Sequence, residues 1–438
     1  MSDYMFMLDS HLSSEQSKVL TAVRDAATEA NLSLFLTGGA MRDMLGGFPI
    51  RDLDFTLEGS AAKLAKIVAH RLDARIVQAD EDRKSVEMVA PGGATFEIAM
   101  ARQEVYGKPG AKVQVRPATI YEDLRGRDFT VNAIALSLSK ASRGLLLDPT
   151  NGLADLEHRE IRAVSNYTLY DDPSRILRLI RFRERLGFQI AERTQLQYQN
   201  VREAELETKI TPAALSRELH QLSGEPLAGQ VLQALEQEKL ISLISPALAG
   251  PKLNLQRFEK LHKAGNLLPF DLGVDHFSLF LHVLLEKLTA KERAGLISAT
   301  ALTKGELNQV AKLEARTKKL EKSLMSAKLQ RPSAVYALLS QEPSELLVYL
   351  LAYSSQRLPV DRIKNYLQKY LPAAREISEA EIAEHAGKPS SPKYKKLREQ
   401  YIAARLDARP KKVAPVEEAP PPPQPGAQPG RRRSTFGG

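Results

Sequence analysis

The sequence of 438 residues predicts an α+β head followed by an all-helical remainder. Short apolar runs alternate with helical patterns in about the first 140 residues, which is typical of a mixed sheet flanked by helices. From about residue 170 onward, apolar residues recur at helical spacing and the strand patterns disappear. Apolar residues make up 43% of the chain and charged residues 26%, a composition typical of globular proteins.

The elements of the head follow in order from these patterns. A strand is predicted over 31–39, closed by two glycines, and a helix begins near Ala40. The same patterns predict a strand over 52–59, a helix over 60–72, strands over 74–79, 85–90 and 94–101, and a further apolar segment over 131–139. The basic stretch 102–118, punctuated by glycine and proline, is predicted to be a mobile loop.

Several classes of protein are excluded by composition. The chain has no cysteine, which excludes a disulfide scaffold, thiol catalysis and cysteine-ligated zinc. Its apolar runs are far shorter than the roughly 20 residues of a membrane helix. The first residues lack the basic and then apolar blocks of a signal peptide, so we expect a cytoplasmic protein. The eight histidines are scattered, and we do not expect a metal phosphohydrolase domain.

Positive charge is concentrated in the last third of the sequence. Residues 1–300 hold 37 Lys and Arg against 39 Asp and Glu, whereas residues 301–438 hold 25 against 14. A localised basic region is typical of a protein that binds a polyanion. A solvated lysine-rich surface would give the same balance. Beyond Arg409 the chain is rich in proline and ends near three arginines, which predicts a disordered tail.

Two carboxylates stand two residues apart in the predicted strand 52–59. Side chains at this spacing point to the same face, so Asp52 and Asp54 are expected to project together. Two like charges this close are costly unless a cation lies between them, and hard oxygen ligands suit Mg²⁺. A pair of surface acids is the alternative, and it is the more common meaning of this short pattern alone.

The glycine pair that precedes the acids changes that interpretation. Gly38 and Gly39 end a strand directly before a helix, where backbone N–H groups approach phosphate oxygens closely. Neither the dinucleotide-binding glycine pattern nor the P-loop pattern is present. A phosphate-binding turn beside a pair of metal-binding acids indicates phosphoryl transfer.

Five segments in order resemble the motifs of the class II tRNA nucleotidyltransferase and bacterial poly(A) polymerase family. The first is TGGAMRDMLGGFPIRDLDFT at 37–56, and the others lie at 122–136, 148–156, 171–188 and, more weakly, 214–222. The resemblance covers roughly residues 30–225. It implies a nucleotidyltransferase-type head over 1–160, a helical neck over 161–228, a helical body and tail that bind tRNA over 229–409, and the tail over 410–438.

The resemblance also implies roles for individual residues. Asp52 and Asp54 would ligate the catalytic Mg²⁺ ions, and Glu97 occupies the position of a third acid that is often found near the metals. The triphosphate would be held by Gly38, Gly39 and Arg42, and the sugar and phosphates would be contacted by Arg127, Asp128 and Asn132. This sequence departs from the family where Gly126 interrupts two usually consecutive arginines, leaving Arg125 and Arg127.

The fourth motif implies selection of the base. Asp172 is expected to cap a helix that begins at Pro173, with Arg175 on the same face. A carboxylate accepts from an exocyclic amine and a guanidinium donates to an unprotonated ring nitrogen, so this pair would take CTP and ATP and reject GTP and UTP. A capping residue with an i,i+3 ion pair is the structural alternative. Arg178 and Arg181 continue the helix and are expected to face nucleotide or RNA.

These observations together predict a template-independent enzyme that adds or repairs the CCA end of tRNA from CTP and ATP with Mg²⁺. A poly(A) polymerase, or a partial enzyme that adds only CC or only A, shares the first four motifs and remains open. A catalytically silent RNA-binding protein is the alternative from a different class. Retention of both Asp52 and Asp54 argues against it, because a silent protein has no need of two mutually repelling carboxylates.

Overall fold

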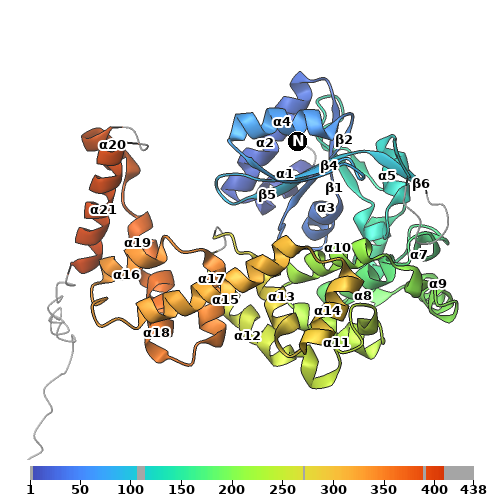
Figure 1. Cartoon of the computed structure of the whole chain (residues 1–438). Coiled ribbons are helices and arrows are strands. Elements are labelled where there is room, and N and C mark those ends of the chain that lie inside the picture. The colour runs from blue at the N-terminus through green and yellow to red at the C-terminus, as the bar shows by residue number, and fades with distance from the viewer. Residues whose placement is uncertain (1–2, 106–113, 270–271, 388–390, 409–438) are drawn as a thin grey trace, which may run out of the picture.

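The computed structural model describes residues 3–105, 114–269, 272–387 and 391–408. It has a mixed sheet near the N-terminus and helices from there on, as predicted (Figure 1). No helix within those ranges is long and apolar enough to cross a membrane. The predicted tail beyond Arg409 lies outside the described residues.

A seven-stranded sheet forms the centre of the head, in the order β3-β4-β5-β2-β1-β8-β9. Neighbouring strands are antiparallel except β2 and β5, which are parallel. The strands are β1 (Ser33–Thr37), β2 (Leu53–Glu58), β3 (Arg75–Asp80), β4 (Ser85–Val89), β5 (Thr95–Met100), β8 (Ala135–Ser137) and β9 (Leu146–Leu147).

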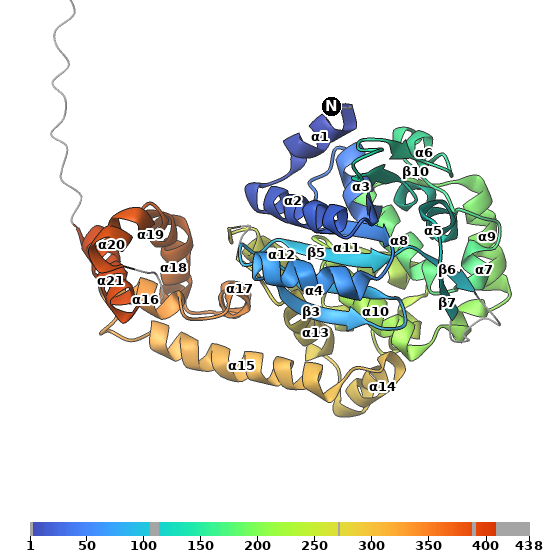
Figure 2. The same ribbon diagram turned by 90° about the horizontal axis from the view of Figure 1, so that it is seen from above.

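Helices cover the sheet on both sides (Figures 1 and 2). Helices α2 (Ser14–Glu29) and α4 (Ala61–Leu72) lie together on one face, and the helical remainder of the chain lies toward the other. The amphipathic pattern of α4 explains its place, because Leu64, Ala65 and Val68 are buried against the sheet. The other helices of the head are α1 (Asp3–His11), α3 (Gly38–Leu45), α5 (Ile120–Gly126) and α6 (Gly152–His158).

Helices make up nearly all of the regular secondary structure that is described after residue 167. Those that adjoin the head are α7 (Thr168–Asp171), α8 (Arg175–Leu186), α9 (Glu192–Glu203), α10 (Pro212–Ser223) and α11 (Ala228–Gln237). Those that continue away from it are α12 (Leu255–Gly265), α13 (His276–Glu286), α14 (Ala290–Thr300), α15 (Lys304–Leu324), α16 (Pro332–Leu339), α17 (Ser344–Tyr353), α18 (Arg357–Asn365), α19 (Leu371–Arg375), α20 (Glu379–Ala386) and α21 (Pro392–Asp407). The long helix α15 leads to the helices farthest from the head (Figure 2).

The hydrophobic cores show which parts pack as one. A single cluster of buried side chains runs from Met5 in the head to Val310 in α15, so the sheet and the helices beside it share one core. A second cluster, from Ala264 to Leu371, lies mainly between α15 and the helices that follow it. The boundaries proposed at residues 160 and 228 therefore fall within one continuous core and stay predictions.

Several predicted elements need correction. Helix α3 begins at Gly38 and not near Ala40, and Asp52 lies just before β2 and not inside it. The stretch 102–118 is not all loop, because β6 (Arg102–Val105) pairs with β7 (Gln114–Pro117), while residues 106–113 lie outside the described part. A two-residue strand, β11 (Gln189–Ile190), pairs with β10 (Glu160–Ile161) where only helices were predicted.

Candidate active site

The turn between β1 and α3 requires its glycines. Gly38 has φ of +61°, a conformation that L side chains rarely adopt. A Cβ atom at Gly38 would lie 3.1 Å from both Arg127 Nη1 and Asp54 Oδ2, and one at Gly39 would lie 3.0 Å from Asp54 Oδ2. The backbone N–H groups of Gly39 and Ala40 donate to Asp54 Oδ2 at 2.8 and 3.3 Å. The N-terminus of α3 thus faces an anion, here the carboxylate of Asp54.

Acidic side chains form a row across three strands beside this turn. Asp54 of β2 is opposite Glu97 of β5, and Glu97 is opposite Glu87 of β4. Burial, then the charges of Glu97 and Asp52, raise the pKa of Asp54 to about 7. Asp52 is exposed and accepts a hydrogen bond from the hydroxyl of Thr95.

This donor set has the chemistry of a site for a hard divalent cation. The charges of Glu97 and Asp52 add to burial in raising the pKa values of Asp54 and Glu87, and a cation would compensate that repulsion. Among the residues that the structure describes, no three acidic, histidine or cysteine side chains already converge on one point. Asp52 and Asp54 fit the metal by their chemistry, and their ligation of it stays a prediction.

Arg127 lies at the same turn, and its predicted contact with the sugar and phosphates stays a prediction. Its guanidinium donates to the hydroxyls of Thr37 and Thr56 at 3.1 and 3.2 Å, and it pairs with Asp123 at 2.9 Å. Its charge lowers the pKa of Asp54, against the larger effects of burial and neighbouring acids. Arg125 is exposed and lies on α5. A cation therefore stands beside the glycine turn and the acids, where phosphate groups would need one.

The other residues of the head that are predicted to contact the nucleotide bond to one another. Asn132 joins them, because its Oδ1 accepts from Arg42 Nη1 at 2.7 Å and its Nδ2 donates to Asp128 Oδ1 at 3.0 Å. Arg42 is 2% exposed and also pairs with Asp43 at 2.7 Å. A contact between Arg42 and a triphosphate would require these bonds to open, and it stays a prediction.

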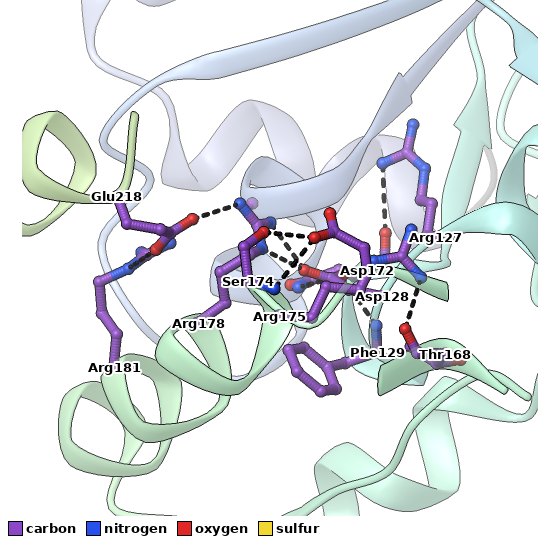
Figure 3. Close-up of polar contacts among 12 residues, drawn as sticks. Arg127, Asp128, Phe129, Thr168, Asp172, Ser174, Arg175, Arg178, Arg181 and Glu218 are labelled. Carbon is purple, nitrogen blue, oxygen red and sulfur yellow. Dashed lines mark hydrogen bonds and ion pairs between the residues drawn. The ribbon is translucent and has the colours of Figure 1, made fainter. Parts of the chain in front are cut away.

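The predicted base-selecting pair lies at the start of α8 (Figure 3). Asp172 accepts from the backbone N–H and the hydroxyl of Ser174, at 3.0 and 2.6 Å. Arg175 is 7% exposed and donates to the carbonyls of Thr168 and Gly126, at 3.4 and 3.2 Å. Helix α8 begins at Arg175, two residues later than predicted, because Asp172 forms a turn with Ser174 and not a cap before Pro173. Arg175 also lies 3.9 Å from Glu104, and selection of the base by Asp172 and Arg175 stays a prediction.

The next two arginines of α8 face acids of the protein (Figure 3). Arg178 pairs with Asp128 at 2.7 Å and with Glu218 at 3.4 Å. Arg181 is 3% exposed and pairs with Glu218 at 3.4 Å and with Glu225 at 2.9 Å. Burial alone would raise the pKa of Asp128, but Arg178 and then Arg175 hold it well below its usual range. Nucleotide contacts by Arg178 and Arg181 stay predictions, and their present partners are acids.

Part of the chain is similar to a described protein family. Residues 34–162 match the family described as the poly A polymerase head domain. The head of this chain is thus similar to that head domain over these residues. The matched segment of the head domain contains the glycine turn, the acids and Arg127, whereas the base-selecting motif at Asp172 lies beyond it.

The similarity to known proteins extends beyond the head domain. The chain is 25% identical over 415 residues to the A-adding tRNA nucleotidyltransferase of Geobacter sulfurreducens, covering 92% of this chain and 47% of that one. It is 34% identical over 203 residues to the CC-adding tRNA nucleotidyltransferase of Deinococcus radiodurans, covering 46% and 53%. The chain thus spans about half the length of these curated relatives. A solved structure of a CCA-adding enzyme in its apo form II is 26% identical, with a TM-score of 0.53 over 94% of this chain and 96% of that one.

Three acids beside the head domain's site were not singled out from the sequence. Glu87 extends the row of acids, and Glu218 and Glu225 compensate the arginines of α8. Glu87 had a signal, since in SVEMV it is the polar residue between apolar neighbours of a strand. The sequence carried no comparable signal for Glu218 and Glu225, because the arginine of α8 with which they pair lies 37 to 44 residues away in the chain.

Proposed function

We propose that this chain is a template-independent RNA nucleotidyltransferase that adds or repairs the 3′-terminal CCA of tRNA from CTP and ATP. The observation that carries the proposal is the conjunction at one turn of a glycine pair at a helix N-terminus, a row of acids and Arg127. Anion binding, cation binding and charge neutralisation are together the requirements of nucleotidyl transfer. The A-adding, CC-adding and CCA-adding relatives support tRNA as the substrate class.

Asp52 and Asp54 would hold two Mg²⁺ ions, which when bound supply Lewis-acid activation of the RNA 3′-hydroxyl and neutralise the departing pyrophosphate. The backbone at Gly38 and Gly39 would bind phosphate oxygens at the positive end of α3. Arg127 would add a fixed positive charge beside them. These groups position the nucleotide and stabilise charge, which is the main requirement of phosphoryl transfer.

Base selection would come from the start of α8. The Asp172 carboxylate would accept from the exocyclic amine of cytosine or adenine, and Arg175 would donate to the adjacent ring nitrogen. Guanine and uracil carry a proton on that nitrogen and would be rejected. In the structure these groups bond to Ser174 and to the carbonyls of Thr168 and Gly126, so a base would have to displace those partners.

Addition of A alone is the second candidate, favoured by the Geobacter relative, which is matched over 92% of this chain. The decisive experiment offers one tRNA in three forms: lacking CCA, ending in C and ending in CC. Each receives CTP, ATP or both, with products resolved to single nucleotides. Two Cs and one A, followed by a stop, are expected.

The other outcomes assign other activities. Incorporation only on the tRNA ending in CC would make the chain an A-adding enzyme, and incorporation of only C a CC-adding one. A long A ladder would make it a poly(A) polymerase. Absence of incorporation with Mg²⁺ present would favour a silent RNA-binding protein. A cytoplasmic location and a contribution of the basic C-terminal helices to tRNA binding belong to the same proposal.

A further inference from the structure

Helix α8 presents three arginines on the face that meets the head and α10. Arg178, Arg181 and Arg185 are three and seven residues apart, so they lie along one side of the helix. Arg183 lies on another side, where it pairs with Glu238 at 2.8 Å. The face of α8 toward the head is thus held by ion pairs. The acids that pair with its arginines fix how α8 packs against the head.

Glu225 stands where several of these charges meet. It follows α10 by two residues, and its side chain is 2% exposed. Arg181 Nη1 donates to its Oε1 at 2.9 Å, while Arg51 Nη1 and Arg185 Nε approach Oε2 to 3.6 and 3.7 Å. Glu225 Oε2 is buried without a hydrogen bond, and so is Arg51 Nε. A buried carboxylate oxygen left in this state is costly, and a small closing movement of either arginine would satisfy it.

The arginines around Glu225 lead to the candidate active site. Arg51 directly precedes Asp52, and its Nη1 also donates to the carbonyl of Gly224 at 3.0 Å. Arg185 reaches Asp43 of α3 at 2.6 Å, behind the glycine turn. Glu225 therefore connects three parts of the site: the approach to the metal-binding acids, the helix behind the phosphate turn and the base-selecting helix.

Positive charge is in excess at this point. Burial, and next the charge of Arg42, lower the pKa of Arg185 to about 10. Arg51 acts in the same direction, while Asp43 and Glu225 oppose it. Glu225 contacts all three of Arg51, Arg181 and Arg185 and reduces the repulsion among them, together with Asp43 at Arg185 and Glu218 at Arg181.

We propose that Glu225 is a positioning residue that holds the head against α8, the base-selecting helix. Its carboxylate contacts both Arg51 of the head and Arg185 of α8, and so links the two sides of this joint between the head and α8. Its catalytic consequence rests on the proposed function, whereas its effect on the joint does not. A neutral side chain at this position removes the acid that Arg51 approaches and leaves Arg181 and Arg185 with only Glu218 and Asp43, and the head turns or moves away from α8. Misplacement of about 1 Å between reacting groups costs on the order of 100-fold in rate.

The test measures the joint directly in the full-length chain. The protein has no cysteine, so Lys66→Cys on α4 and Gln233→Cys on α11 give two unique sites for spin labels. Both positions are exposed, and α11 packs on α8. The distance distribution between the labels is compared by pulsed electron paramagnetic resonance in the parent, Glu225→Gln, Glu225→Asp and Glu238→Gln. Glu238→Gln is the matched control, because it removes an ion pair of α8 that does not involve the head.

We expect the distance distribution to be shifted or broadened in Glu225→Gln and unchanged in Glu238→Gln. In Glu225→Asp it should be largely restored to that of the parent. Native distances in Glu225→Gln would overturn the proposal. If Glu225→Gln does not fold, Arg51→Gln takes its place, because it removes one contact of the head and leaves the bond between Arg181 and Glu225. Native distances in Arg51→Gln would overturn the proposal equally.

Incorporation of CTP and ATP gives the functional measurement. Glu225→Gln is expected to lower kcat by roughly 10- to 100-fold with little change in KM for the nucleotide. Glu238→Gln is expected to change neither. An unchanged kcat alongside shifted distances would refute the catalytic part. The distance measurement needs no turnover, so an inactive parent would count against the proposed function and leave the test of the joint intact.

Discussion

Asp128→Asn removes the charge of the most fully bonded carboxylate at the candidate site. Asp128 is buried, accepts from the backbone of Phe129 and the amide of Asn132, and pairs through its other oxygen with Arg178 at 2.7 Å (Figure 3). The asparagine either keeps the first two bonds and turns its N–H donors toward the guanidinium, or offers the guanidinium a neutral oxygen and loses those two bonds. Removal of one partner of a buried ion pair typically costs 3–5 kcal/mol.

We expect the lower end, about 3 kcal/mol, because Arg178 keeps a contact with Glu218 at 3.4 Å and its side chain is 29% exposed. The thermal transition of the head should fall by roughly 5–10 °C. Glu160→Gln is the control, since its pair with Arg162 is more than a third exposed and is worth less than about 1 kcal/mol.

The double variant separates the ion pair from other effects of the substitution. Asp128→Asn combined with Arg178→Met removes both charges, which is far cheaper than leaving one buried. Its free energy of unfolding should exceed that of Asp128→Asn by at least about 1.5 kcal/mol. A double variant that is no more stable than Asp128→Asn would refute the reasoning, as would a single variant within about 0.5 kcal/mol of the parent.

The same pair predicts a dependence on pH. The pKa of Asp128 lies well below its usual value of about 4, so its contribution to stability is complete above that value. As the pH falls below about 4, the unfolded chain binds the proton first and the contribution is lost. The difference in melting temperature between parent and Asp128→Asn should therefore narrow between pH 5 and pH 3. A constant difference over that range would contradict the assignment.

Three further changes test the rest of the site. Asp52→Ala should lower incorporation on the order of 1000-fold, because metal-bound charge stabilisation is worth several kcal/mol, and unchanged incorporation would show that the metal assignment is wrong. Gly38→Ala and Gly47→Ala both place alanine at positive φ, and each should lower the free energy of unfolding by roughly 1–2 kcal/mol. Only Gly38 has side-chain atoms close to the position of the added Cβ, so only Gly38→Ala should also weaken nucleotide binding, as measured by titration. Truncation after Arg409 should leave incorporation unchanged, and loss of most activity would place part of the RNA site in the tail.

The sequence predicted the strands of the head because each carries its own alternating or continuous apolar pattern. The strands over 74–79, 85–90 and 94–101 all form, within one or two residues of their predicted ends. The order β5-β2-β1 that brings Asp54 beside Glu97 was not predictable from pattern, since it depends on pairing between distant segments. The start of α8 was misplaced because Asp172 and Ser174 both suit a helix cap, and local preference does not choose between them.

The arginines show where reasoning from motifs reaches its limit. A motif tells which arginine stands at which position, and from the motifs Arg42 was predicted to hold the triphosphate and Arg178 and Arg181 to face nucleotide or RNA. In the structure each pairs with a carboxylate of the protein, through Asp43, Asp128, Glu218 or Glu225. A guanidinium that is buried must be paired, and a chain that carries it in a motif must also supply the acid elsewhere.

That requirement has a consequence for the nucleotide. An incoming triphosphate carries several negative charges into a site whose arginines already have acidic partners, so it gains most from cations whose present partners are neutral. Arg127 bonds to two threonine hydroxyls and pairs with one acid, Asp123 at 2.9 Å, and Arg175 donates to two carbonyls and lies 3.9 Å from one acid, Glu104, so each has neutral partners beside its acid. Arg181, held between Glu218 and Glu225, has the least capacity to exchange its partners for a triphosphate. Substitution of Arg127 by Gln should consequently weaken nucleotide binding more than the same change at Arg181, whose loss should instead lower the stability of the joint between head and α8.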